Sequence, residues 1–217
     1  MPSQVEWPKD MSFLDPIHKL AEQVKGFLEP EEGRRLYALA LEAAHMGPCL
    51  EIGSYCGKSA LYLGSACRER KATLYSIDHH RGSEEQQPGE YYFDPDLFNP
   101  FLYRVDTFGH FRQTLQRAGL EEVVVPLVAS SAAVANGWGT PLSLVFIDGG
   151  HAYDTVLTDY ERWYSHILAG GYLLFHDIYP NPADGGQAPY EVYQKAVDSG
   201  HYKEKSMTGS LGVLQRV

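Results

Sequence analysis

The sequence has few cysteines and no apolar run long enough to cross a bilayer. Its 217 residues include only three cysteines, Cys49, Cys56 and Cys67, and no C-x-x-C pair. Neither a zinc ribbon nor a disulfide framework is expected, and the thiols are expected to be reduced.

The first ten residues carry Glu6 and Asp10 without an apolar core, which argues against a signal peptide. We therefore expect a cytoplasmic protein that does not enter a membrane.

The sequence also lacks an excess of basic residues. It has 18 Lys and Arg against 28 Asp and Glu, a formal net charge of −10. A nucleic-acid binder needs a basic stripe, and the one dense basic cluster, at residues 68–71, is typical of a solvated helix end. The expected partner is therefore a small molecule rather than DNA or RNA.

Short apolar runs alternate with helical stretches along most of the chain, which is typical of a parallel sheet with crossover helices. The expected strands are residues 48–52, 73–77, 123–127, 142–147 and 171–175. The expected helices are residues 31–45, 59–70, 153–168 and 187–199, with Gly170 and Gly171 ending the third. Residues 201–207 and 211–216 are expected to form a hairpin at the sheet edge. The pattern predicts an α/β fold with a doubly wound, mostly parallel sheet and helices on both faces.

We expect one domain over residues 1–217, and two segments depart from the alternation. Residues 1–47 read as an N-terminal helical lead-in, and residues 82–112 are too long for a simple connection and rich in aromatic residues. One interpretation of residues 82–112 is a cap over a pocket. The other is a satellite cluster that packs on the sheet or on a homodimer partner.

A glycine-containing turn follows the first expected strand. Gly53 and Gly57 allow a sharp turn and a close approach of the backbone to a ligand, and the helix beginning near Ser59 directs free N–H groups there. The turn lacks the G-x-G-x-x-G pattern of dinucleotide-binding proteins. It also lacks the glycine at position 52 that a phosphate-binding P-loop requires.

Polar residues follow the other expected strands too. Asp78 ends the second strand, with His79 beside it, where an acid can accept both ribose hydroxyls of a nucleoside. Ser130 and Ser131 follow the third, where small hydroxyl residues leave room for a ligand ring and Ser131 could equally cap a helix.

Two acids and two histidines follow the fourth and fifth expected strands. Asp148 and His151 come after residues 142–147, and His176 and Asp177 come after residues 171–175. All four should therefore converge at the carboxyl edge of the sheet. A buried pair of carboxylates is costly unless a cation or a shared proton relieves it. The alternative for each histidine is a structural hydrogen bond to a carbonyl.

These motifs together resemble a known family. The pattern E-x-G-x-x-x-G at Glu51, Gly53 and Gly57, with D-G-x-H-x-Y at residues 148–153 and H-D at residues 176–177, is similar to class I S-adenosylmethionine-dependent methyltransferases. Within that class it resembles the macrocin-type, antibiotic-tailoring O-methyltransferases and, more distantly, catechol O-methyltransferase. The resemblance covers roughly residues 48–180. It implies a Rossmann-like fold with seven strands, and S-adenosylmethionine as the cofactor.

The resemblance also implies roles for individual residues. The turn would pass under the methionine part of the cofactor, with the acid contacting its amino group directly or through water; Asp78 would hold the ribose, and the two serines would border the adenine. The implied cofactor-binding residues are Glu51, Gly53, Ser54, Gly57, Ser59, Asp78, His79, Ser130, Ser131 and Asp148. The implied catalytic residues are Asp148, His151 and His176, with His151 or a metal-assisted Asp148 removing the proton of an acceptor hydroxyl.

The relatives hold Mg²⁺ with oxygen ligands after the fourth and fifth strands, which implies Asp148 and Asp177 here. The sequence departs from that pattern, because His176 precedes Asp177 and Ile178 follows it. A metal set of Asp148, His176 and Asp177 favours a transition metal over Mg²⁺, or the site is metal-free. Three other functions stay open: a nicotinamide-dependent oxidoreductase, a non-catalytic binding module and a hydroxylase-like tailoring protein.

Overall fold

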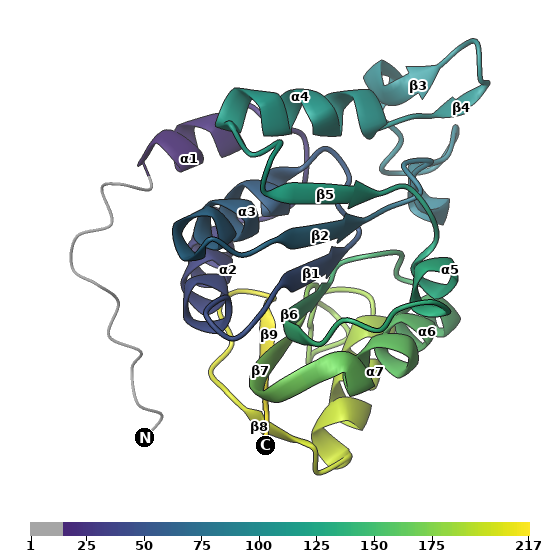
Figure 1. Ribbon diagram of the computed structural model, residues 1–217. Coiled ribbons are helices and arrows are strands. Elements are labelled where there is room, and N and C mark those ends of the chain that lie inside the picture. Colours follow the sequence, from purple (N-terminus) through teal and green to yellow (C-terminus); the bar gives the residue numbers. More distant parts are fainter. Residues whose placement is uncertain (1–14) are drawn as a thin grey trace.

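A seven-stranded sheet forms the centre of the molecule in the computed structural model, which describes residues 15–217 (Figure 1). The strand order is β5-β2-β1-β6-β7-β9-β8, and β9 runs antiparallel to both of its neighbours. The strands are β1 Cys49–Ile52, β2 Leu74–Ile77, β5 Val124–Leu127, β6 Leu142–Ile147, β7 Ile167–Phe175, β8 Tyr202–Glu204 and β9 Gly212–Arg216. The predicted fold class, with its antiparallel edge hairpin, is confirmed.

Helices cover both faces of the sheet (Figure 1). On one face lie α1 Asp15–Ala21, α2 Pro30–Ala43, α3 Lys58–Arg70 and α4 Phe108–Ala118; on the other lie α5 Ser131–Ala135, α6 Tyr153–Trp163 and α7 Ala188–Asp198. Alternate residues of a strand point to opposite faces, so Phe146 packs in the first core and Val145 in the second. Central strands buried on both faces read as continuous apolar runs, which is why they could be located from the sequence.

The helix expected over residues 153–168 is shorter than predicted. It ends at Trp163, continues as the 3-10 turn η4 Tyr164–His166, and β7 begins at Ile167. Gly170 and Gly171 therefore lie inside a strand and do not stop a helix. The β6–β7 register shifts here, and a Cβ on Gly171 would lie 2.6 Å from the carbonyl oxygen of Ser143. The glycine permits close strand packing, a requirement that helical spacing does not reveal.

The two irregular segments contain more regular structure than the sequence indicated. Residues 82–112 hold η2 Glu84–Gln86, η3 Pro95–Leu97 and a small hairpin of β3 Phe98–Asn99 and β4 Arg104–Val105. The helix α4 also begins inside this segment and was not predicted. Of the expected lead-in, residues 15–47 carry α1 and α2, and residues 1–14 lie outside the described residues. Within the described residues, no helix combines the length and the apolar character needed to span a bilayer.

The strand registers place the polar residues in one row. Ile52 pairs with Ile77 and with Ile147, and Ile147 pairs with Phe175. The four residues that follow these strand ends are Gly53, Asp78, Asp148 and His176. They therefore leave the carboxyl edge of the sheet side by side, where open α/β sheets form their ligand sites.

Candidate functional site

A large cavity of about 1180 Å³ runs along this carboxyl edge. Its walls include the turn after β1, Asp78 and His79 after β2, the start of α5, and residues 148–151 after β6. The lead-in contributes residues 25–29 and the cap segment contributes residues 82–87 and Tyr92. The first part of residues 82–112 therefore lines the cavity, while Phe101 and Tyr103 on the distal hairpin are 95% and 85% exposed.

The glycine at position 53 is required by contact between two turns. Its φ is +90°, and a Cβ would lie 1.9 Å from the carbonyl oxygen of Asp148. A side chain would therefore separate the turn after β1 from the turn after β6. The sequence predicted close approach to a ligand, and the structure adds this approach of backbone to backbone.

Asp78 lies in the cavity wall with both carboxylate oxygens anchored. One oxygen accepts from the backbone N–H of Tyr55 at 2.8 Å, and the other accepts from that of His80 at 2.7 Å. Each oxygen keeps a further lone pair for a ligand hydroxyl. Nearby, the Ser54 hydroxyl is buried in the wall and has no hydrogen-bond partner among the described residues. A ligand with polar groups would satisfy it.

Glu51 lies behind the cavity wall, whereas the resemblance implies that it contacts the cofactor's amino group, directly or through water. Its side chain is fully buried, lies outside the cavity wall, and accepts from the hydroxyls of Ser59 at 2.7 Å and Ser76 at 2.5 Å. Burial, only partly offset by these hydrogen bonds, raises its pKa to about 7. Ser59 does line the cavity, so Glu51 supports the wall from behind. Gly57 also lies outside the wall, where it packs against α4 through Phe111.

The two serines after β5 have different hydrogen-bond partners, and the one that caps α5 is not the one that was predicted to do so. Ser130, and not Ser131, caps α5, since its hydroxyl accepts from the N–H of Ala133. Ser131 accepts from the indole N–H of Trp163 at 2.7 Å. Burial raises the pKa of nearby Asp159 to about 6, and a hydrogen bond with Ser131 partly opposes this rise. Both serines line the cavity, together with Asp159.

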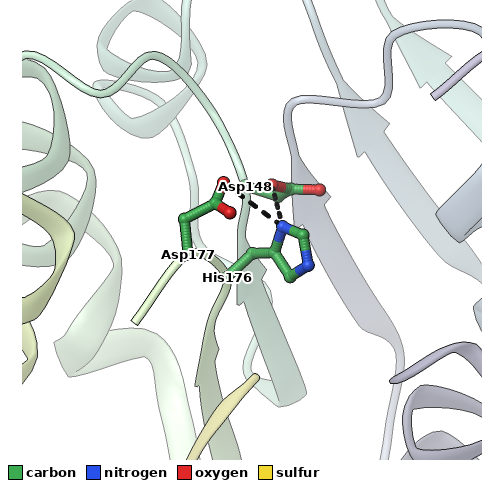
Figure 2. A group of neighbouring side chains, drawn as sticks. All are labelled: Asp148, His176 and Asp177. Atoms are coloured by element: carbon green, nitrogen blue, oxygen red, sulfur yellow. Dashed lines mark ion pairs between the residues drawn. The ribbon is translucent and has the colours of Figure 1, made fainter. Parts of the chain in front are cut away.

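His176 lies between carboxylates contributed by three parts of the chain. Its Nε2 is 3.0 Å from Glu32 of α2, and its Nδ1 is 3.1 Å from Asp148 and 3.4 Å from Asp177. Figure 2 shows the two aspartates directed at the same ring nitrogen. Burial alone would lower the pKa of His176, but the surrounding carboxylates raise it far above its usual range. Burial raises the pKa of Asp148, and the nearby imidazoles oppose this.

His151 links the strand edge to the cap. Its Nε2 lies 2.9 Å from Asp177, and its Nδ1 lies 3.2 Å from Glu85 of η2. The hydrogen bond with Asp177 is the main reason that the pKa of His151 rises to about 9. The two histidines outweigh burial and hold the pKa of Asp177 far below its usual range. The structure thus brings together all four residues predicted at this edge.

Two acids at this site were not predicted from the sequence. Glu32 is 2% exposed and 144 positions from its partner His176, while Glu85 lies in the cap and reaches His151. Both belong to segments with no recognised motif. The capping-box pattern of α2, in which Glu32 reaches back to the N–H of Glu29, was the one local signal available.

The predicted metal set has its donor atoms close together. One atom each from Asp148, His176 and Asp177 lies within 4.8 Å of the others. The set offers two oxygens and one nitrogen, and Ile178, where a third oxygen was expected from the relatives, is buried in the second core. Mg²⁺ prefers oxygen ligands in an octahedron, so these residues do not fit that ion.

Comparison with known proteins shows the family. A family model described as a methyltransferase domain matches residues 50–178, which include the strand ends followed by Gly53, Asp78, Asp148 and His176. The chain belongs to this family of methyltransferases. A curated relative, an uncharacterised protein of Acanthamoeba polyphaga mimivirus, is 31% identical over 65 residues. That stretch is 30% of this chain and 26% of the viral protein, so the chain matches about a quarter of its relative's length.

Solved structures share the fold of this methyltransferase. The O-methyltransferase NovP superposes with a TM-score of 0.67 at 18% identity, covering 95% of this chain and 98% of NovP. TomG of Streptomyces achromogenes, solved with S-adenosylmethionine, gives 0.62 at 14% identity, covering 99% and 92% of the two chains. The Bacillus cereus O-methyltransferase, solved with S-adenosylhomocysteine, gives 0.62 at 16%, covering 98% and 94%.

Proposed function

We propose that this methyltransferase transfers the methyl group of S-adenosylmethionine to a hydroxyl oxygen of a small molecule. The observation that carries the proposal is that one cavity joins Asp78 and the turn after β1 to the acid–histidine group at Asp148 and His151. The first end suits a nucleoside and the second end suits an acceptor. The solved O-methyltransferases of this fold, two of them holding the cofactor or its product, support the same assignment.

The cofactor would occupy the end of the cavity nearest β2. Asp78 would accept the ribose hydroxyls with the lone pairs that its backbone contacts leave free. The buried Ser54 hydroxyl would meet the methionine part, and the serines after β5 would border the adenine. The sulfonium methyl would then face Asp148 at the acceptor end.

The acceptor hydroxyl would lie between Asp148 and His151. Its oxygen lone pair forms the new bond to the methyl carbon, the carbon–sulfur bond breaks, and its electrons remain on sulfur as S-adenosylhomocysteine. The proton passes to Asp148, whose raised pKa makes it a better base than an exposed aspartate. His151, with its pKa of about 9, is protonated at neutral pH and stabilises the developing negative charge on the acceptor oxygen.

Holding the acceptor in line supplies most of the rate in such a displacement. The cap residues 82–87 and the lead-in residues 25–29 line the same cavity, and the aromatic rings of Phe27 and Tyr92 meet edge to face at 5.3 Å. An acceptor of modest size with an apolar face would fit a cavity lined in this way. The net charge of −10 is a further reason to expect a small molecule instead of a nucleic acid.

The direct test is calorimetric binding followed by transfer of a labelled methyl group. We expect S-adenosylhomocysteine to bind with one site per chain and NADH not to bind. Incubation with methyl-labelled S-adenosylmethionine and a panel of phenols, catechols and sugars should then label one class at oxygen. Binding of NADH without the adenosyl ligands would favour the nicotinamide alternative, and adenosyl binding with label on nitrogen would refute the oxygen acceptor.

A further inference from the structure

Asp159 is an acid on the buried side of α6. The helix also buries Val156, Tyr160 and Trp163, at the spacing expected of an apolar helix face. Asp159 is only 4% exposed, and no lysine, arginine or histidine among the described residues pairs with it. A buried carboxylate without a cation is costly and needs hydrogen-bond donors. The packing of α6 alone therefore does not account for an acid at this position.

One donor to Asp159 comes from the start of α5. The Ser131 hydroxyl accepts from the indole N–H of Trp163 at 2.7 Å and also forms a hydrogen bond with Asp159. An ionised carboxylate only accepts hydrogen bonds, so Ser131 donates its proton to Asp159 and keeps none for a ligand. The two carboxylate oxygens together offer about four lone pairs. Asp159 therefore keeps the capacity to accept from a ligand after its bond with Ser131.

A glycine keeps side-chain atoms away from one oxygen of this carboxylate. Gly149 lies in the turn after β6, and a Cβ on it would lie 3.2 Å from Oδ2 of Asp159. That distance is shorter than an ordinary van der Waals contact, so a side chain at position 149 would crowd the oxygen. Gly149 and Asp159 both line the cavity. The missing side chain leaves room for a ligand group beside the carboxylate.

The strand order places the base of a bound nucleoside on the side of Ser131. The sheet runs β5-β2-β1-β6, so β5 lies on the far side of β2 from β6. With the ribose on Asp78 after β2 and the methyl group facing Asp148 after β6, the base extends toward β5 and the start of α5. Ser131 and its partner Asp159 line the cavity there. The exocyclic amine of adenine is a hydrogen-bond donor, which is the group that Asp159 lacks.

We propose that Asp159 recognises the cofactor's adenine by accepting a hydrogen bond from its exocyclic amine. This inference rests on the proposed use of S-adenosylmethionine and adds the residue that distinguishes adenine from other purines. A purine with an oxo group in place of the amine sets a second acceptor against the carboxylate, which is repulsive. A purine without either group leaves the carboxylate short of a donor. Asp159 takes no part in the methyl transfer itself.

The first experiment compares ligands that differ only at the exocyclic group of the purine. Calorimetry measures the affinity of each protein for S-adenosylhomocysteine, for S-inosylhomocysteine and for the purine analogue that lacks the amine. We expect the wild type to prefer the adenosyl ligand over the inosyl ligand by about 100-fold, and Asp159→Asn to reduce this preference below about 10-fold, because an amide also donates to the oxo group. The matched control is Glu161→Gln, the same change at a half-exposed position of α6, which should keep the wild-type preference.

A stability measurement separates recognition of the ligand from a structural role. Burial raises the pKa of Asp159 to about 6 from an ordinary 3.8, so its favourable contribution to folding is fully present below pH 3.8 and is lost as pH rises through 6. At pH ~8, Asp159→Asn should therefore melt no lower than the wild type, although it binds S-adenosylhomocysteine more weakly. A lower melting temperature with an unchanged adenosyl-to-inosyl ratio would assign Asp159 to the fold alone.

A second variant leaves the acid in place. Gly149→Ala sets a methyl group against Oδ2 of Asp159. We expect it to lower the affinity for S-adenosylhomocysteine more than the affinity for the analogue without the amine. Equal losses for both ligands would show that Oδ2 does not face the amine. This test holds whether or not Asp159→Asn folds.

The outcomes separate this inference from the proposed function. If S-adenosylhomocysteine does not bind the wild-type protein, the proposed function and this inference both fail. If it binds no better than S-inosylhomocysteine, or if Asp159→Asn keeps the wild-type preference, the cofactor assignment holds and the role of Asp159 is refuted. Loss of the preference in Asp159→Asn, with a retained melting temperature, supports both.

Discussion

Glu51 and Ser76 face each other across the β1–β2 pair, and the Ser76 hydroxyl donates to Glu51 over 2.5 Å. Burial raises the pKa of Glu51 to about 7 against an ordinary value of 4.5. The pKa of Glu51 is higher in the folded protein than in the unfolded chain. Its contribution to the free energy of unfolding is therefore fully present below pH 4.5 and is lost as pH rises through 7. Above neutral pH, the ionised carboxylate of Glu51 therefore lowers the free energy of unfolding.

Glu51→Gln should therefore stabilise the protein at alkaline pH. An amide keeps hydrogen-bonding capacity toward Ser59 and Ser76 and does not ionise. We expect the free energy of unfolding to rise by about 1–3 kcal/mol relative to wild type above pH ~7, with the gain shrinking toward pH ~4.5. Urea unfolding at several pH values measures it, with exposed Glu121→Gln as the control. A gain that does not depend on pH would contradict the pKa explanation.

Asp78→Asn should weaken binding of S-adenosylhomocysteine without unfolding the protein. The amide keeps the shape but cannot accept from both ribose hydroxyls and the two backbone N–H groups. Loss of hydrogen bonds to a charged group costs roughly 1.5–3 kcal/mol, so we expect a loss of about 10- to 100-fold in affinity by calorimetry. Exposed Asp184→Asn should bind like wild type, and equal affinities for both variants would remove Asp78 from the site.

Asp148→Asn should reduce turnover more than cofactor binding. The proposed base is lost while the shape of the cavity is kept, so kcat is expected to fall by about 10²–10⁴-fold. The Kd for S-adenosylhomocysteine should stay within about threefold of wild type, since that ligand lacks the acceptor. The comparison needs labelled methyl transfer with the identified acceptor, and full turnover by the variant would exclude Asp148 as the base.

Gly53→Ala should be strongly destabilising because the new Cβ would lie 1.9 Å from the Asp148 carbonyl oxygen, at a φ of +90°. We expect a loss of about 3 kcal/mol or more in the free energy of unfolding, which is the range of the severe single substitutions. Gly137→Ala is the matched control, since a Cβ there meets nothing within 4 Å. Comparable unfolding midpoints for the two variants would show that the turns separate easily.

Lys25→Ala should loosen the cap. Lys25 pairs with Asp94 and Asp96 and so ties the lead-in to the cap segment. Because the pair is partly exposed, the effect on global stability should stay below about 1 kcal/mol. Hydrogen exchange should instead rise locally in residues 82–106, and Lys203→Ala on exposed β8 serves as the control. Unchanged exchange in the cap would show that other contacts hold it.

The row of polar residues at the sheet edge was predictable because each residue directly follows a buried strand. Strand ends are marked by the change from apolar to polar residues, so Asp78, Asp148 and His176 could be placed together from the sequence alone. The glycine at 53 was predictable as a tight turn. Its contact with the Asp148 carbonyl was not, because no pattern records how closely two turns approach.

The remaining parts of the site depend on tertiary packing. Glu32 lies on a helix whose sequence gives only a capping pattern, and its partners come from the residue after β7 and from the turn before β9. The end of α6 at Trp163 was misplaced because an apolar strand start at Ile167 continues the helical spacing. The helix α4 was missed because its aromatic residues merge with those of the cap.

The turn at residues 209–210 has a consequence for the order in which the protein is made. Residues 48–180 supply the strand ends and both aspartates, so a nascent chain of that length already encodes the nucleoside end of the cavity. Glu32 has also been synthesised by then, but the donors of its two shortest hydrogen bonds, the N–H and hydroxyl of Ser210, have not. Glu32, the partner of His176 on α2, therefore gains these two contacts only after the hairpin of β8 and β9 has left the ribosome.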